Sequence, residues 1–240
     1  MEPINQKNQA GFSLMELIIA LTITLTVMSI AVTMLARTIK VRARENEHVD
    51  ELGDVQRGLN IMSREIANAG FNLLDNKGIV AADSNAHAIR IRANLNKFDT
   101  TGTISSAAKN GIGVPLEDAG EDVTFFVNDT ANTNYLARWD MYAATKGTVL
   151  ANRVDTIGFY YFDRKVTYTQ DPNNCQITSP LNDAGVSQAY VTPDNAKFVV
   201  ILVCIGTPAV GTPGSPGYQP DSHTLLISDV ALRNSNLNKY

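Results

Sequence analysis

The sequence predicts an α+β chain in which one long amino-terminal helix carries a domain of antiparallel strands. Three observations support this prediction. An apolar run begins near the amino terminus, and Glu16 is the only charged residue between Phe12 and Ala36. Residues 37–69 contain no proline and carry an apolar stripe at helical spacing. After Asn72 the pattern changes to short alternating or fully apolar segments separated by turn residues.

Residues 12–36 are predicted to span a membrane. At about 1.5 Å rise per residue, a helix of this length reaches roughly 37 Å, enough to cross a hydrocarbon layer of about 30 Å. No proline interrupts the run, and its hydroxyl side chains can bond back to carbonyl groups of the same helix. A cleaved secretory signal is the alternative, with Ser29-Ile30-Ala31 as its cleavage site. The length of the apolar run and the acid at its start argue against that alternative.

Glu16 requires an explanation, because a carboxylate at the centre of a membrane span costs roughly 2.5–3.5 kcal/mol. Its position near the end of the span lowers this cost. A natural partner for such an acid is a positively charged amine at the head of a neighbouring chain.

The run Gly11-Phe12-Ser13-Leu14-Met15-Glu16-Leu17-Ile18-Ile19-Ala20 resembles the processing signal of type IV prepilins and of type II secretion pseudopilins. The resemblance implies a leader, residues 1–11, which a membrane peptidase removes by cutting between Gly11 and Phe12. It also implies that the new amino terminus, Phe12, is N-methylated and that Glu16 pairs with such an amine during assembly. The expected fold is then pilin-like.

The basic residues beside the span conflict with the orientation that this resemblance implies. The positive-inside rule would keep the carboxyl side of the span in the cytoplasm. The resemblance implies the reverse, a single-pass inner-membrane protein with a periplasmic globular domain that later enters a pilus or pseudopilus at the cell surface. We give the processing motif more weight than the charges, which belong to Arg37, Lys40, Arg42 and Arg44.

Residues 37–70 are predicted to continue the helix as an amphipathic half. Gly53 and Gly58 lower its helix propensity by roughly 1 kcal/mol each relative to alanine, and Gly70 supplies a stop signal. We interpret the stripe as packing on the chain's own domain. A dimeric coiled coil is the alternative, although fewer than four heptads support it. The stripe consists of Leu52, Val55, Leu59, Met62, Ile66, Ala69 and Leu73.

Other segments resemble one group of these proteins more closely. The run Met62-Ser63-Arg64-Glu65-Ile66-Ala67-Asn68-Ala69-Gly70-Phe71 resembles the end of the first helix in PilW-type minor pilins, although Asn68 replaces a basic residue and Phe71 a tyrosine. The segment 148–162 and the ending Leu232-Arg233-Asn234 resemble the same family more loosely.

The globular domain, residues 71–240, is predicted to be rich in strands. Ile89 and Ile91 alternate with Arg90 and Arg92, which indicates a buried face and a solvated face. The segment 198–205 is apolar throughout and is predicted to be the most buried strand. Further strands are expected at 78–82, 123–127, 134–139, 148–162 and 224–234. Irregular structure is expected at 94–122, 169–193 and 207–220.

Composition and cysteine count narrow the class of protein. The chain has 240 residues, of which 44% are hydrophobic and 18% charged, and its net charge is −4. These values fit one globular domain plus an anchor and offer no general attraction for nucleic acid. Cys175 and Cys204 permit one disulfide, which an exported domain would favour. Two buried free thiols are the alternative.

No motif for catalysis, a cofactor or a metal is found. His48, His87 and His223 are isolated in the sequence, and residues 94–99 have part of the oxygen spacing of a calcium loop. Phe98 stands where that loop requires an acid. We therefore predict a protein that is not an enzyme, without cofactor or metal.

The function that the resemblance implies is that of a minor pilin, which is incorporated into a type IV pilus or primes it. The implied partners are prepilin peptidase, other pilins that bind through the amino-terminal helix, and the assembly platform of the inner membrane. Two alternatives stay open. One is a J-type pseudopilin of a type II secretion system, and the other is a single-pass membrane sensor or binding protein.

Overall fold

The computed structural model describes residues 12–73, 77–95, 116, 118–130, 133–215 and 218–234. The leader with Gly11 lies outside the described residues, as do Phe98 and most of the irregular segment predicted at 94–122. The chain divides into two compact units, Met1–Glu47 and His48–Tyr240. Helix α1 spans Leu14–Ala67 without interruption, which confirms the prediction of one long amino-terminal helix.

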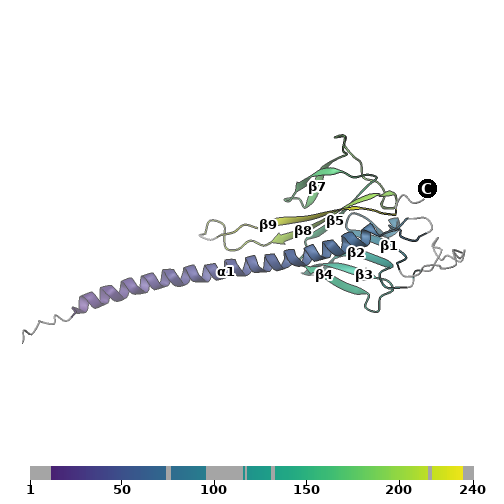
Figure 1. Ribbon diagram of the computed structural model, residues 1–240. Helices are drawn as coiled ribbons and strands as arrows, with labels where there is room; N and C mark the ends of the chain where they lie inside the picture. Colours follow the sequence, from purple (N-terminus) through teal and green to yellow (C-terminus); the bar gives the residue numbers. More distant parts are fainter. Residues whose placement is uncertain are drawn as a thin grey trace, which may run out of the picture. The chain divides into compact units, whose positions relative to one another are not determined.

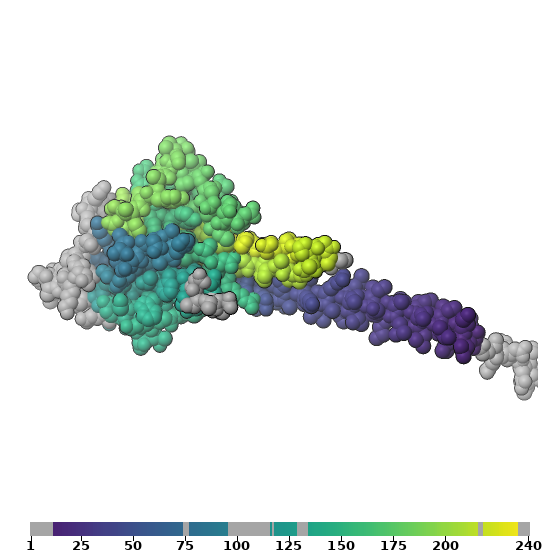
Figure 2. Space-filling model, turned by 180° about the vertical axis from the view of Figure 1, so that it is seen from behind, coloured from purple at the N-terminus to yellow at the C-terminus, as the bar shows by residue number. Residues whose placement is uncertain are grey.

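In the first unit, every described residue from 12 to 40 is exposed. This segment contains a window of 18 residues with a mean hydropathy of 2.3, none of it buried, so it is long and apolar enough to cross a membrane. Figure 2 shows it as a row of purple side chains. As predicted, threonine hydroxyls within the run donate to carbonyl oxygens of the preceding turn: Thr24 to Ala20 at 2.7 Å and Thr33 to Ile30 at 2.8 Å.

In the second unit, two antiparallel sheets and a separate hairpin follow the helix (Figure 1). The first sheet has the strand order β1-β2-β3-β4 and the second has the order β5-β8-β9. The first sheet comprises β1 (Ala88–Arg92), β2 (Asp122–Thr130), β3 (Thr133–Asp140) and β4 (Gly147–Asn152). The second comprises β5 (Thr156–Phe162), β8 (Phe198–Thr207) and β9 (Ser222–Ala231). The hairpin consists of β6 (Thr167–Asp171) and β7 (Gln176–Leu181), and short 3₁₀ turns lie at Ala81–Asp83 and Pro193–Asn195.

One hydrophobic core lies between the carboxyl-terminal part of α1 and both sheets. The predicted stripe forms the helix side of this core, since five of its members are buried in it and Leu52 packs against them partly buried. Its last member, Leu73, is buried in a separate cluster with Leu116. The stripe therefore packs on the chain's own domain. Gly58 lets the helix approach the first sheet closely, because a Cβ at this position would lie 3.2 Å from Leu136 Cδ2.

Strand β8 is buried on both faces, which explains why its sequence is apolar throughout. One face contacts the core with the helix, and the other contacts a second cluster that includes Val166 and Ile177. These two residues belong to the β6–β7 hairpin and the segment before it, so the hairpin covers the outer face of the second sheet. In Figure 2 the hairpin region is the green projection of the second unit. The prediction of a fully buried strand at 198–205 is confirmed.

Residues 233–234 cap the carboxyl end of α1. The amide N–H of Arg233 donates to the Ala67 carbonyl oxygen at 3.2 Å. The side-chain amide of Asn234 donates to the carbonyl oxygens of Asn68 and Ala69 at 3.2 and 3.3 Å. These bonds satisfy acceptors that a helix end leaves without partners. Gly70 adopts a φ of 83°, which accounts for the stop signal there.

Three predictions about strands are wrong. The segment 148–162 is split into β4 and β5, which lie in different sheets, because Arg153 turns the chain with a φ of 55°. The segment 78–82 forms only an isolated bridge between Ile79 and Ile91 before the 3₁₀ turn begins. The segment 169–193 is not irregular throughout, because most of the β6–β7 hairpin falls within it.

The prediction of a solvated face for Arg90 and Arg92 is also wrong. Both guanidinium groups contact the carboxylate of Asp122 on β2, at 2.7 and 3.1 Å. Asp122 is 3% exposed, and the two arginine side chains are about one-fifth exposed. Arg90 also contacts Asp83 at 2.7 Å. The polar face of β1 is therefore an ion-paired face, because the neighbouring strand supplies an acid directly opposite Arg92.

Candidate functional site at the amino terminus

The first turn of α1 places Glu16 at the amino-terminal end of the helix. The helix begins at Leu14, so Ser13 is the capping residue and Glu16 is the third residue of the first turn. Glu16 Oε2 accepts the backbone N–H of Ser13 at 3.2 Å, and Ser13 Oγ accepts the backbone N–H of Met15 at 3.3 Å. Ser13 and Glu16 therefore form a capping box. The serine hydroxyl oxygen accepts a backbone N–H of the first turn, and the glutamate carboxylate accepts the backbone N–H of the capping residue.

This capping box has an electrostatic consequence. The amino-terminal end of a helix carries a partial positive charge, which stabilises a nearby carboxylate. Glu16 is exposed, and its carboxylate is held on the side of the chain from which Phe12 enters the helix. Phe12 itself is 86% exposed. An amine that approached from solvent would therefore meet an oriented carboxylate at the end of an apolar rod.

The Ser-x-x-Glu spacing at residues 13 to 16 is visible in the sequence, and it predicts this cap without a structure. Glu16 was explained above only by a partner in another chain, although this spacing also predicts a role within its own helix. Glu16 can cap its own helix and pair with another chain at the same time, because a carboxylate has more acceptor sites than one backbone N–H occupies.

Part of the sequence matches a known protein family. Residues 6–32 match the family described as the prokaryotic N-terminal methylation motif. This match supports a type IV prepilin-like protein. The matched residues include Gly11, Phe12 and Glu16 and extend into the exposed apolar part of α1. The comparisons with curated proteins and with solved structures gave no match.

The motif also supports a pilin or pseudopilin that is processed by prepilin peptidase and assembles with other pilins. Together with the apolar helix, it supports anchoring in a membrane and association with a pilus. The family is in general not enzymatic.

Cys175 and Cys204 are joined by a disulfide in the structure, with 5.7 Å between their Cα atoms. The sequence left the bridged and free states open. Cys204 is fully buried on β8, whereas Cys175 is half-buried in the turn between β6 and β7 and has a φ of 50°. The bond ties the tip of the hairpin to the central strand of the second sheet.

A buried ion-pair network joins α1 to β3. Arg138 Nε lies 3.1 Å from both carboxylate oxygens of Glu65, and Arg138 Nη1 lies 3.0 Å from Asp140 Oδ2. Burial raises the pKa of the Glu65 carboxyl, and the Arg138 guanidinium opposes this rise. Burial lowers the pKa of Arg138, but the hydrogen bonds and charges of Glu65 and Asp140 outweigh this effect and raise it.

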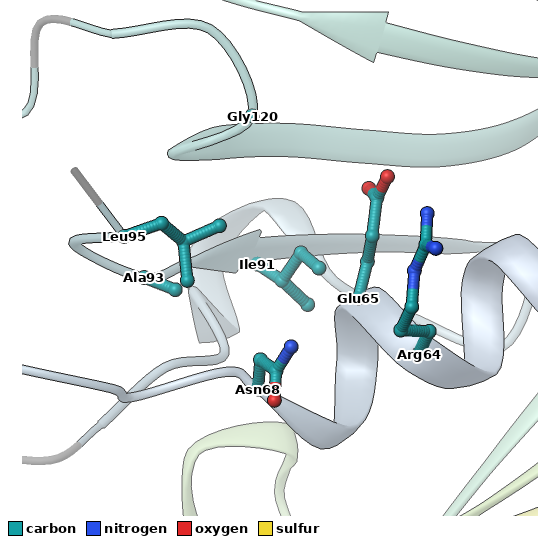
Figure 3. Close-up of a pocket in the computed structure, with 7 residues that line it drawn as sticks. All are labelled: Arg64, Glu65, Asn68, Ile91, Ala93, Leu95 and Gly120. Atoms are coloured by element: carbon teal, nitrogen blue, oxygen red, sulfur yellow. The ribbon is translucent and has the colours of Figure 1, made fainter.

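A pocket of 260 Å³ lies beside this network, between α1, β1 and the turn before β2 (Figure 3). Figure 3 shows Arg64 and Glu65 on the helix, Asn68 just after its end and Ile91 on the facing strand. Glu65 already has Arg138 as its partner, so its carboxylate braces the helix against the first sheet. Ala93, Leu95 and Gly120 complete the lining.

The three histidines, isolated in the sequence, lie in three different environments. The ring Nδ1 of His48 lies 3.1 Å from the Thr207 hydroxyl, and that of His87 lies 2.9 Å from the Ile157 carbonyl oxygen. His223 lies beside the disulfide, with its Nδ1 3.9 Å from Cys204 Sγ.

Proposed function

We propose that this chain is a PilW-type minor pilin, which prepilin peptidase cleaves between Gly11 and Phe12 and which is incorporated into a type IV pilus or primes its assembly. Residues 1–11 are the leader, 12–36 the membrane-spanning half of the helix, 37–70 its amphipathic half, and 71–240 the globular domain. The observation that carries the proposal is the methylation motif on a helix whose first part is apolar and fully exposed. A membrane or a bundle of similar helices is what such a surface requires.

The proposed mechanism is storage in the membrane followed by assembly. Lipid tails are as apolar as leucine, so packing the rod against other rods gains little from the hydrophobic effect. The charged pair between Glu16 and the methylated amine of Phe12 in a neighbouring subunit then sets the axial register. Such a pair matters most in a low-dielectric surrounding. The capping box supports this role, because it holds the carboxylate toward the amino-terminal side before a partner arrives.

The PilW-type assignment is supported by a contact between two resembling segments. The end of the helix, residues 62–71, and the ending Leu232-Arg233-Asn234 are separated by most of the globular domain in the sequence. In the structure, Arg233 and Asn234 bond to carbonyl groups of residues 67–69. The two segments thus serve one purpose, closing the carboxyl end of α1, which gives a physical reason for them to occur together.

The proposed location follows from the proposed processing. The span holds the chain in the inner membrane with the globular domain in the periplasm, against the preference of the basic residues after the span, and the chain then enters the filament. Its partners are prepilin peptidase, the inner-membrane assembly platform and other pilins, which it contacts through the amino-terminal helix.

The role of Glu16 is tested by Glu16→Ala in the native host. We expect normal membrane insertion and cleavage but a large loss of the protein from sheared surface filaments, because the pairing carboxylate is gone. Glu16→Asp keeps the charge and should retain part of the incorporation. Glu45→Ala removes an exposed acid further along the same helix and serves as the matched control.

Wild-type incorporation of the Glu16→Ala protein would refute the assembly role. Recovery with type II secretion components rather than with pili would favour a J-type pseudopilin.

A further inference from the structure

The surroundings of Cys204 bring together four residues that commonly bind metals and that are far apart in the sequence. Cys204 lies on β8, His223 lies on β9, Asp155 precedes β5, and Cys175 lies between β6 and β7. The ligand atoms of Cys175, Cys204 and His223 all lie within 4.8 Å of one another. His223 Nδ1 also lies 3.3 Å from Asp155 Oδ2.

Strand register produces this convergence. Thr156 of β5 pairs with Cys204, and Gly206 of β8 pairs with His223. Cys204 and Gly206 are two residues apart, so both positions point to the same face of the sheet. The backbone N–H of Asp155 donates to the Cys204 carbonyl oxygen at 3.0 Å. Three adjacent strands therefore deliver a sulfur, an imidazole and a carboxylate to one place.

Gly206 leaves the space in which the carboxylate lies. A Cβ at this position would overlap the carboxylate of Asp155, chiefly its Oδ2 atom. The central strand thus has a gap in its row of side chains at this point. Any side chain there would displace Asp155 from His223.

The distances fit tetrahedral zinc. Bond lengths of about 2.3 Å to sulfur and about 2.0–2.1 Å to nitrogen or oxygen require ligand separations of roughly 3.6 Å for S···N and roughly 3.3 Å for N···O. In the structure, Cys204 Sγ lies 3.9 Å from His223 Nδ1, which in turn lies 3.3 Å from Asp155 Oδ2. One imidazole nitrogen thus lies at about the ligand separation from two other donors.

We propose that reduction of the Cys175–Cys204 disulfide creates a zinc site with Cys175, Cys204, His223 and Asp155 as its four ligands. A dithiol reductant transfers two electrons and two protons to the bridge and becomes a cyclic disulfide, leaving two protein thiols. Zinc then displaces the two thiol protons and binds both thiolates, His223 Nδ1 and Asp155 Oδ2. Zinc replaces the disulfide as the link between the hairpin and β8.

The site is open to solvent. Cys204 is fully buried, but Cys175 is half-buried and the side chains of His223 and Asp155 are 37% and 44% exposed. A cation can therefore reach the imidazole and the carboxylate from solvent.

The test uses the full chain in detergent, with Co²⁺ as a spectroscopic substitute for zinc. The chain is reduced with a trialkylphosphine, which consumes one water and becomes the phosphine oxide, because a dithiol would itself chelate the metal. We expect the reduced chain to bind one Co²⁺ with the strong visible bands of a tetrahedral site and a sulfur-to-metal charge-transfer band. Zinc should remove both signals. The oxidised chain should show neither.

Single substitutions distinguish this four-ligand site from non-specific binding of Co²⁺ to the two thiols. Loss of an outer partner of a metal ligand already costs about 10–100-fold in affinity, so His223→Ala and Asp155→Asn should each weaken Co²⁺ binding by at least about tenfold. Gly206→Ala should weaken it too, through displacement of Asp155. His87→Ala is the matched control, because that ring bonds to the carbonyl oxygen of Ile157 and not to a proposed ligand. The fold of each oxidised variant is checked by circular dichroism.

Three results would overturn the proposal. One is a reduced wild-type chain that is folded but gives no tetrahedral Co²⁺ spectrum. The second is affinity in His223→Ala and Asp155→Asn equal to that of His87→Ala. The third is a reduced chain that unfolds and does not regain its fold when zinc is added.

Discussion

Loss of the Cys175–Cys204 disulfide should destabilise the globular domain by an amount that follows from the length of the loop it closes. The two cysteines are 29 residues apart in the sequence. In the chain-entropy description, closing such a loop in the unfolded state is worth about 3.5 kcal/mol at 25 °C. Domains of this size typically have about 5–15 kcal/mol of stability, so the expected loss is a substantial part of the total.

The assay is urea unfolding of the oxidised full chain in detergent, followed by the fluorescence of Trp139. This residue is the chain's single tryptophan, and it lies on β3. With a slope of about 2 kcal/mol per molar urea, Cys175→Ser should lower the midpoint by roughly 1.5–2 M. Wild-type protein reduced with a phosphine in metal-free buffer should match this variant. Adding Cys204→Ala to Cys175→Ser should cost only about 1 kcal/mol more, for the buried sulfur that is lost.

Comparing the single and double cysteine variants sharpens this test, because either single substitution breaks the same bond. If the bond carries the effect, the second substitution adds little, and the two single variants lose similar amounts. A free energy of unfolding of Cys175→Ser within about 0.5 kcal/mol of that of the oxidised wild type would refute the reasoning. Fully additive losses from the two single variants would refute it as well.

Three further changes test other parts of the account. Gly11→Arg should block removal of the leader, seen as uncut protein in mass spectrometry, while Gly11→Ala should have a milder effect; efficient cleavage of Gly11→Arg would contradict the proposed processing site. Arg138→Met should cost roughly 3 kcal/mol in urea unfolding because it leaves two mostly buried acids without their cation. The control Arg57→Met breaks an exposed pair with Asp54 and should cost less than about 1 kcal/mol, so equal losses would count against the network. Gly53→Ala, with open space around its Cβ, should stabilise by about 1 kcal/mol, whereas Gly58→Leu should destabilise by about 1–3 kcal/mol; the opposite order would contradict the close packing of α1.

The helix and its buried stripe could be predicted because both follow from local periodicity. Val55, Leu59, Met62 and Ile66 recur at helical spacing, and all four are buried in the structure. The strand at 198–205 was equally predictable, because burial on both faces leaves no polar residue in it. In both cases burial constrains residues that are close together in the sequence, so the pattern is visible in a short segment.

Other features depend on partners that are distant in the sequence. Arg90 and Arg92 alternate with isoleucines as a solvated face would, and only the pairing of β1 with β2 shows that Asp122 neutralises them. The segment 148–162 is split because Arg153 has a left-handed backbone conformation, and arginine is not a residue type that predicts a turn.

The amino-terminal motif could be predicted from the sequence, whereas the group of residues around Cys204 could not. The motif around Gly11, Phe12 and Glu16 is contiguous, and it was recognised from the sequence and is matched by the methylation-motif family. The group formed by Asp155, Cys204 and His223 arises from strand register across three strands, so no spacing rule could have found it. His223 was judged isolated because its neighbours in the sequence are not its neighbours in the fold.

The amino terminus of this chain is proposed to be a signal for processing and assembly. Intact-mass analysis of the wild-type chain, extracted from the membranes and surface filaments of its native host, tests both roles in one experiment. We expect a chain that begins at Phe12, carries one added methyl group on its amino terminus and is present in the filament fraction. A chain that still carries residues 1–11, lacks the methyl group and occurs only in membranes would contradict this proposal.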